Sequence, residues 1–266
     1  MKAQEIFSAI EELAPLRYQE SYDNAGIQVG DAEAEVTGVL LCTDVTDAVL
    51  DEAIALHHNV VVSHHPLIFH GLKKIAGHTA VERMVAKAIK HDITVYSAHT
   101  NMDNTPADGV SFKMAQKLGM IDVEVLDVHR IACEDGASQC YGSGVIGTIA
   151  TTPAGELLNR VKTLFGVPTV RFSGNAETLV TRVALCGGAG SFLIDQAIQA
   201  GAHIFITGDM KYHDFQGHEH EIVLADMGHY ESEQFTKEIF FDIIQRKKPT
   251  FAVAFAKLER NPINYI

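Results

Sequence analysis

Residues 60–66 have the sequence Val60-Val61-Val62-Ser63-His64-His65-Pro66, an apolar run that stops at two histidines and a proline. A short run without polar alternation is typical of a strand that is buried on both faces of a parallel sheet. Helical spacing precedes this run over residues 47–57 and follows it over residues 79–91, and a second apolar run covers residues 93–97. Alternating strands and helices of this length form βαβ units. We therefore predict an α/β fold with mostly parallel sheets.

The same pattern occurs a second time further along the chain. Residues 36–65, shifted by 144 positions, fall without gaps on residues 180–209, and eight of the thirty pairs are identical. Any two βαβ units share apolar runs, but the common order of strand, helix and strand favours an internal duplication. We expect two similar, intertwined α/β/α three-layer domains. In this alignment His65 corresponds to Asp209, and both follow a strand at the end where open parallel sheets place their ligand sites.

The length of 266 residues suits one large domain or two modest ones. We place the first domain at residues 1–100 plus 218–266 and the second at 101–217, with a loop over residues 122–140. A content of 47% hydrophobic and 21% charged residues excludes wholesale disorder. The net charge of −13 makes nucleic acid a poor partner, and no apolar run reaches the roughly 18 residues of a membrane span. The first residues lack the pattern of a signal peptide, which predicts a cytoplasmic protein.

Fourteen histidines are the first indication of function, because imidazole is the commonest metal ligand and a usual proton carrier. Three segments place histidines or carboxylates directly after predicted strands: Ser63-His64-His65-Pro66, His99-x-x-x-Asp103 and His229-x-x-x-Glu233. Each segment also has a simpler explanation. A histidine can belong to the core, Asp103 can start an Asx turn, and Glu233 suits the N-terminus of a helix.

Together the three segments supply a set of five donors: His64, His65, Asp103, His229 and Glu233. This set of nitrogen and oxygen donors lacks thiolate and suits zinc, iron, manganese, cobalt or nickel. Five side chains are too many for one tetrahedral catalytic site that keeps an open position. They are enough for two metal ions that share a bridging carboxylate. We therefore predict two divalent metal ions per subunit.

Two further segments follow predicted strands. Asp209 and His213 can be outer partners of metal ligands or a general acid and base, and a loop without function is equally open. His99 and His213 are the candidates for carrying a proton. Gly187-Gly188-Ala189-Gly190 lies between a strand and a helix, where backbone amides can hold a phosphate, but a tight turn is the better-supported interpretation.

The chain resembles the NGG-interacting-factor-three-like family, whose members are called GTP cyclohydrolase I type 2 homologues. The resemblance covers nearly the whole chain in the family's order and is carried by these segments: Asp23-Asn24-Ala25-Gly26-Ile27-Gln28-Val29-Gly30, Ser63-His64-His65-Pro66, His99-Thr100-Asn101-Met102-Asp103, Thr207-Gly208-Asp209-Met210-Lys211-Tyr212-His213 and Gly228-His229-Tyr230-Glu231-Ser232-Glu233. Tyr22 and Met102 stand where the family often has tryptophan and leucine. The chain is similar to the short form of the family, without the domain that longer members insert between the halves.

The resemblance implies a dinuclear site in which His64 and Asp103 hold one ion, His65 and His229 hold the other, and Glu233 bridges them. It also implies a ring-shaped homohexamer whose sites face an inner cavity. The activity it suggests is a ring-opening hydrolysis of a purine nucleotide by a metal-activated water. The alternatives are a metal-dependent phosphoesterase and a non-catalytic metal-binding or regulatory scaffold. The candidate catalytic residues in the enzymatic hypothesis are His99, His213 and Asp209.

Overall fold

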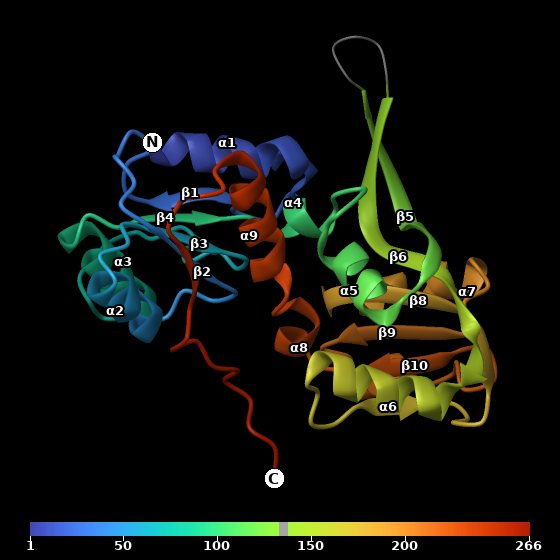
Figure 1. Cartoon of the computed structure of the whole chain (residues 1–266). Coiled ribbons are helices and arrows are strands. Elements are labelled where there is room, and N and C mark those ends of the chain that lie inside the picture. The colour runs from blue at the N-terminus through green and yellow to red at the C-terminus, as the bar shows by residue number, and fades with distance from the viewer. Residues whose placement is uncertain (133–137) are drawn as a thin grey trace. The chain divides into compact units, whose positions relative to one another are not determined.

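The computed structural model describes residues 1–132 and 138–266, which divide into two compact units (Figure 1). Unit 1 comprises Met1–Met102 and Thr236–Pro262, and unit 2 comprises Asp103–Phe235 and Ile263–Ile266. The chain thus leaves unit 1 close to the predicted residue 100. The predicted return at residue 218 is wrong, because the strand β10 (Val223–Asp226) pairs within the sheet of unit 2.

Among the described residues, unit 1 has a five-stranded sheet in the order β1-β4-β3-β2-β11. The strands are β1 (Gly26–Val29), β2 (Val39–Cys42), β3 (Val60–Ser63), β4 (Thr94–Ser97) and β11 (Val253–Phe255). β4, β3, β2 and β11 are parallel neighbours, and β1 is antiparallel to β4. Every residue of β2, β3 and β4 is buried, which explains their continuous apolar sequence. The expectation of a mostly parallel sheet is confirmed for this unit.

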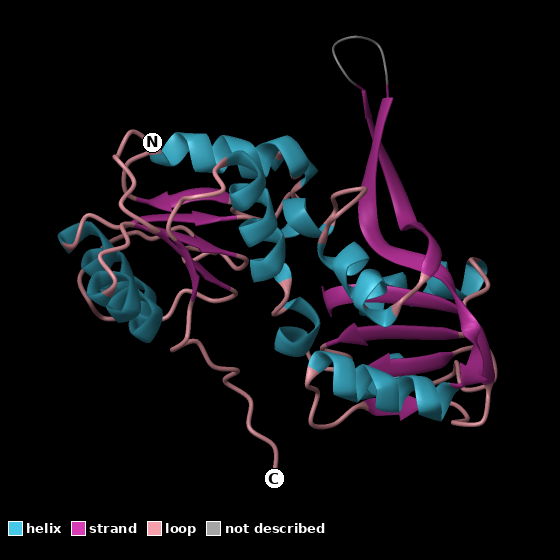
Figure 2. Cartoon of the chain, viewed as in Figure 1, coloured by secondary structure: helices cyan, strands magenta, loops and turns pink. Residues whose placement is uncertain are grey.

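Helices cover both faces of the unit 1 sheet (Figure 2). They are α1 (Ala3–Leu13), α2 (Asp47–Ala55), α3 (Ala80–Lys90) and α9 (Thr236–Lys247), with the short η1 (Leu16–Tyr18) and α4 (Thr100–Asp103) beside them. The side chains of Thr46 and Thr79 cap α2 and α3, because they accept hydrogen bonds from backbone amides in the first turns of these helices. Leu40 and Val61 pack with α2 and α3 on one face. Phe7 of α1 stacks on Tyr96 on the other, with 4.5 Å between ring centroids.

Unit 2 has a six-stranded sheet over its described residues, in the order β5-β6-β8-β9-β10-β7. The strands other than β10 are β5 (Ile121–Ala132), β6 (Ser138–Pro153), β7 (Arg171–Ser173), β8 (Leu179–Ala189) and β9 (Ile204–Gly208). β8, β9 and β10 are parallel, whereas β5, β6 and β7 each pair antiparallel with a neighbour. The expectation of a mostly parallel sheet therefore fails for this unit, whose sheet is mixed.

The helices of unit 2 also form layers on the two faces of its sheet. They are α5 (Val110–Leu118), α6 (Ala154–Phe165), α7 (Ile194–Gln199) and α8 (His229–Glu233), with η2 (Ser191–Leu193) and η3 (Tyr212–Phe215). α5 and α6 share one core with Val183 and Ile204, and η2 and α7 share the other with Phe205 and Leu224. A three-layer α/β arrangement is thus present in each unit.

The region that we predicted as a loop over residues 122–140 is largely a hairpin. β5 and β6 pair antiparallel from Ile121↔Thr148 onward, and Figure 1 shows that they extend beyond the other strands of unit 2. Residues 133–137 of the predicted loop lie outside the described residues. Among the described residues, no helix has the length and apolar character that a bilayer crossing needs.

The repeat seen in the sequence is present in the strand register. Val39 pairs with Val60 in unit 1, and Val183 pairs with Ile204 in unit 2, so both pairs are related by the shift of 144 positions. The helix α2 corresponds in the same way to η2 and α7. His65 and Asp209 accordingly follow equivalent strands, β3 and β9, at the carboxyl ends of the parallel strands.

Candidate metal centre

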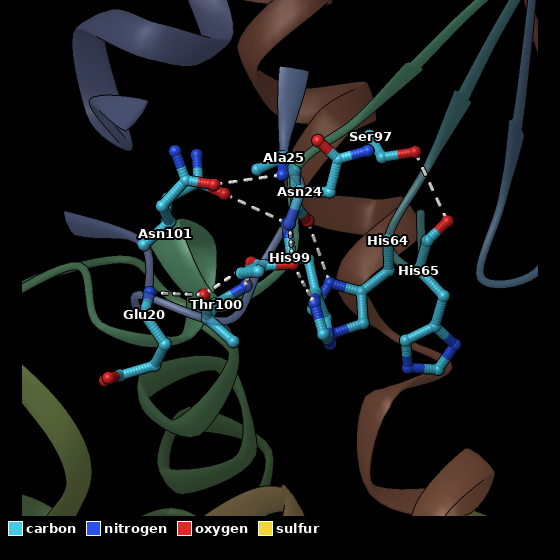
Figure 3. A network of polar contacts seen from close by, with 12 residues as sticks. Glu20, Asn24, Ala25, His64, His65, Ser97, His99, Thr100 and Asn101 are labelled. Atoms are coloured by element: carbon cyan, nitrogen blue, oxygen red, sulfur yellow. Dashed lines mark hydrogen bonds and ion pairs between the residues drawn. The ribbon is translucent and has the colours of Figure 1, made fainter. Parts of the chain in front are cut away.

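Three imidazoles lie together at the carboxyl ends of β3 and β4 in unit 1 (Figure 3). His64 and His65 follow β3, and His99 follows β4, which is the parallel neighbour of β3. The ring centroids of His64 and His65 are 4.9 Å apart, and each is 5.3 Å from that of His99. Their potential ligand atoms lie within 4.8 Å of one another, so these histidines could hold a metal ion.

All three rings are oriented through Nδ1. The Nδ1 of His64 is 2.9 Å from the carbonyl oxygen of Ala98. The Nδ1 of His65 is 2.8 Å from a carboxylate oxygen of Asp44, and that of His99 is 2.8 Å from one of Asp23. Because a carbonyl or a carboxylate can only accept, Nδ1 carries the proton in each ring and Nε2 carries the lone pair. This is the arrangement that outer partners impose on metal-binding histidines.

Asp23 contacts this group of imidazoles, although our sequence analysis quoted it only within a segment of the family resemblance and gave it no role. Its side chain is fully buried and also accepts hydrogen bonds from the backbone amide and the hydroxyl of Thr100. Burial alone would raise the pKa of this carboxyl, but the hydrogen bonds from His99 and Thr100 lower it to about 2. Asp23 is therefore a buried anion beside the imidazoles. The signal in the sequence was weak, because Asp23 lies in a turn-rich stretch far from His99.

Serine hydroxyls join the two strand ends below the imidazoles. The hydroxyls of Ser63 and Ser97 are 2.7 Å apart, and that of Ser63 also donates to the carbonyl of His65 at 2.8 Å. These bonds satisfy buried polar groups where the strands stop pairing. They also fix the backbone that carries His64 and His65.

In unit 2, His229 and Glu233 lie one turn apart on α8. The Nδ1 of His229 is 2.9 Å from a carboxylate oxygen of Asp209, and its Nε2 is 2.9 Å from one of Glu233. With the proton on Nδ1, the Nε2 lone pair faces a second anionic oxygen. A proton or a cation between Nε2 and Glu233 would remove this repulsion, so the donor chemistry fits a metal ion here.

The carboxylates of Asp103 and Glu233 both affect the pKa of Cys186, which lies near the end of β8. Burial is the main reason that the pKa of the Cys186 thiol is raised, and the negative charges of Asp103 and Glu233 raise it further. The two carboxylates therefore lie near the same buried thiol. The potential metal-binding groups that include these carboxylates consist of histidine and acidic residues, which is the nitrogen and oxygen set that the sequence predicted.

The glycine-rich segment at the end of β8 gives room to Glu233. A Cβ on Gly188 would lie 2.1 Å from a carboxylate oxygen of Glu233, and the residue has a left-handed φ of +62°. The amides of Gly187 and Gly188 donate to the hydroxyls of Ser111 and Ser232. Because these amides are used within the protein, the geometry does not favour a phosphate-binding loop. The predicted tight turn is instead an irregular end of the strand β8.

The two remaining predicted catalytic residues differ in their surroundings. Asp209 has a left-handed φ of 54° and accepts from Nδ1 of His229, so the geometry favours an orienting role over a general acid or base. His213 is exposed on η3, where its Nδ1 is 3.0 Å from the side-chain oxygen of Gln216. Within the described parts of the chain, His213 belongs to no group that could hold a metal ion.

Asp226 is a second residue that the sequence analysis did not single out for a role. It is buried at the end of β10, is paired with Arg171, and accepts hydrogen bonds from the amides of Met210 and Gly228. Met210 follows Asp209, and Gly228 precedes His229. One carboxylate thus fixes the two loop positions that bring Asp209 and His229 into contact.

The predicted site residues gather in two sets, one in each unit. Unit 1 brings His64 and His65 together with His99. Unit 2 contains Asp103, His229, Glu233 and Asp209, with His229 in direct contact with both Glu233 and Asp209. In both sets the ring nitrogen Nδ1 faces an acceptor, and in unit 2 the Nε2 of His229 faces Glu233.

The comparison with known proteins decides the family. The sequence model of Duf34/NIF3 (NGG1p interacting factor 3) matches residues 1–262. The chain belongs to this family. The resemblance that we noted in the sequence is thereby confirmed.

Relatives within the family share most of the chain. A GTP cyclohydrolase 1 type 2 homolog of Clostridium perfringens is 32% identical over 234 residues, which cover 88% of this chain and 87% of that protein. One of Staphylococcus aureus is 25% identical over 369 residues and covers all of both chains, so it carries segments that this chain lacks. The crystal structure of a Staphylococcus aureus protein has a TM-score of 0.90 at 28% identity and covers 100% of this chain and 99% of that chain.

Proposed function

We propose that this protein is a metal-dependent hydrolase that opens the ring of a purine nucleotide and uses two divalent metal ions per subunit. The proposed ligands are His64, His65, Asp103, His229 and Glu233. In this proposal His64 and Asp103 hold one ion, His65 and His229 hold the other, and Glu233 bridges them. The substrate class follows the name of the relatives, GTP cyclohydrolase 1 type 2 homolog.

The proposal rests on four imidazoles that are held in the same way. Each has its Nδ1 against an acceptor, and the four acceptors are the carbonyl of Ala98 and the carboxylates of Asp44, Asp23 and Asp209. Histidines elsewhere have such partners too, as His213 does, so the support comes from the place of all four rings just after parallel strands. Carboxylate partners also make the ring a better ligand and fix its tautomer. This pattern supports metal binding in both units.

Bound divalent metal ions would lower the pKa of water to roughly 7 and so supply hydroxide at neutral pH. The protein's own residues would orient the ligands and move protons. Asp23 stays ionised and holds the Nδ1 proton of His99, so the Nε2 of His99 is the atom that would accept and return a proton. Asp209 would keep His229 in its ligating tautomer. His213 is the other proposed proton carrier, and its exposure favours His99 over it.

The substrate test uses the metal-loaded protein with GTP. Ring opening of the purine would release formate, and we expect formate without inorganic phosphate. Phosphate without formate would support the phosphoesterase alternative. Stoichiometric metal binding without either product, for GTP and related purine nucleotides, would reject the substrate and favour a metal-binding scaffold.

We further propose that the protein assembles as a ring-shaped homohexamer. The basis is the family resemblance. Six chains of 29.0 kDa would have a mass of about 174 kDa. Light scattering on a sizing column measures this mass directly, and a monomer or dimer at working concentration would reject the hexamer without affecting the metal site.

A further inference from the structure

Two exposed aromatic side chains lie beside the imidazoles of unit 1. Tyr22 is 64% exposed and Phe69 is 39% exposed. Their ring centroids are 6.4 Å apart. The Phe69 ring also meets the His99 ring edge-on, with 6.1 Å between centroids and an angle of 76°. Large apolar rings are thus presented to solvent next to histidines that could hold a metal ion.

Polar contacts hold the two aromatic segments together. Asp23, next to Tyr22, is bound to His99 and Thr100. The side-chain amide of Asn24 donates to the carbonyl of Ile68 at 2.6 Å, so the segment that carries Tyr22 is joined to the one that carries Phe69. The amide of Ile68 also donates to the side chain of Gln28 at 3.1 Å. The backbone segments that carry the two rings are therefore held together by bonds that do not depend on burying the rings.

We propose that Tyr22 and Phe69 form a stacking subsite for a planar heteroaromatic ring, such as a nucleobase. Aromatic side chains bind the π-face of any base, and this stacking contributes substantially to the binding of each base. A ring that stacks here lies beside His99 and hence beside the candidate metal ligands of unit 1. The inference deepens the proposed function, on which it rests for the identity of the substrate, by assigning the residues that would recognise the base.

A nearby groove offers a competing position on the same unit. A cavity of about 920 Å³ lies between β1, α3 and the segment that contains Lys73 and Lys74. Its apolar lining includes Val85 and Ile89, and the residues that line it include neither Tyr22 nor Phe69. It also lacks the three imidazoles. A base bound in this groove would have no histidine beside it. Because the groove and the stacking subsite have different residues, substitutions can show which of them binds the base.

The test is calorimetric titration of the full chain with guanosine, and with ribose as a probe that lacks the base. Tyr22→Leu and Phe69→Leu keep apolar bulk but remove the ring, and both sites are exposed enough for the fold to persist, which circular dichroism checks. We expect each to weaken guanosine binding by about tenfold or more. Tyr22→Trp should bind at least as tightly as the unaltered chain. Phe172→Leu is the matched control, because Phe172 is 45% exposed on β7 of unit 2.

Three results would overturn the subsite: no binding of guanosine by the unaltered chain, equal binding of ribose, or leucine variants that bind guanosine normally. Loss of binding in Ile89→Asn with normal binding in Tyr22→Leu would place the base in the groove instead. A different result would reject the proposed hydrolase activity and leave the stacking subsite intact. A chain that binds guanosine through Tyr22 but releases neither formate nor phosphate from GTP would keep the subsite and lose the hydrolase.

Discussion

The two units have equivalent parallel strands, but different potential metal ligands follow these strands. In unit 1, β3 is followed by His64 and His65, and the equivalent strand β9 of unit 2 is followed by Gly208 and Asp209. The next parallel strand of each unit, β4 or β10, leads to a histidine with an acid four residues later. These pairs are His99 with Asp103 and His229 with Glu233.

The difference shows how one scaffold presents two kinds of donor set. Unit 1 supplies imidazoles, and its acidic partners Asp23 and Asp44 serve to orient them. Unit 2 supplies one imidazole among carboxylates, and Gly188 at the end of β8 makes room for the buried Glu233. The strands fix the positions of the potential metal ligands. The residues just after the strands determine whether those ligands are imidazoles or carboxylates.

The largest effect is expected at the carboxylate of unit 2. In Glu233→Gln, metal affinity should fall more than about 100-fold, because the loss of a ligand exceeds the 10–100-fold effect of losing an outer partner. Titration of chelator-treated protein with Zn²⁺ measures this. Glu219→Gln, at an exposed position of the same unit, is the control. An unchanged number of bound ions in Glu233→Gln would remove Glu233 from the ligand set.

The outer carboxylates provide a direct comparison of the units. Asp44→Asn in unit 1 and Asp209→Asn in unit 2 remove the partners of the proposed ligands His65 and His229, and each should weaken metal binding by about 10- to 100-fold. The side chain of Asp44 is 41% exposed and that of Asp209 is 54% exposed, so water screens the second interaction more strongly and its loss should have the smaller effect. The same Zn²⁺ titration ranks the two variants. The reverse order would mean that burial of the partner does not set its influence.

A smaller effect on metal affinity is expected from a change at Gly188, near the end of β8. Gly188→Ala places a Cβ against Glu233 and should weaken metal binding by about tenfold, since the carboxylate must shift. Gly166→Ala is matched in backbone strain, with a φ of +64°, but its Cβ would meet no heavy atom within 4 Å. Both variants should have a lower free energy of unfolding in urea, because alanine is strained at a positive φ. Equal metal affinities in the two would show that Gly188 matters only for its φ.

The smallest effect concerns the fold of unit 1 alone. Thr46 caps α2 by accepting a hydrogen bond from the amide of Val49 at 3.2 Å. Thr46→Ala should lower the free energy of unfolding by about 1 kcal/mol and leave Zn²⁺ affinity unchanged. Urea unfolding monitored by circular dichroism measures the first quantity. A change in metal affinity would reveal a coupling between the cap of α2 and the imidazoles.

Local patterns in the sequence predicted much of this molecule. The apolar runs of β3 and β4 and the repeat that relates Val39–Val60 to Val183–Ile204 are short-range signals, and the structure confirms them. The roles of Asp23 and Asp226 could not be predicted, because each depends on partners that only the folded chain brings close. The hairpin of β5 and β6 and the place of β10 in the second sheet were missed for a related reason. Strand pairing depends on tertiary structure, and composition does not reveal it.

Anomalous diffraction from crystals grown with Zn²⁺ tests the central claim most directly. The account predicts two peaks per chain at the zinc edge, each bonded to Nε2 of a histidine among His64, His65 and His229, with the Glu233 carboxylate between them. Crystals that contain zinc in solution but show no peak at these histidines, or rings bonded through Nδ1, would contradict it.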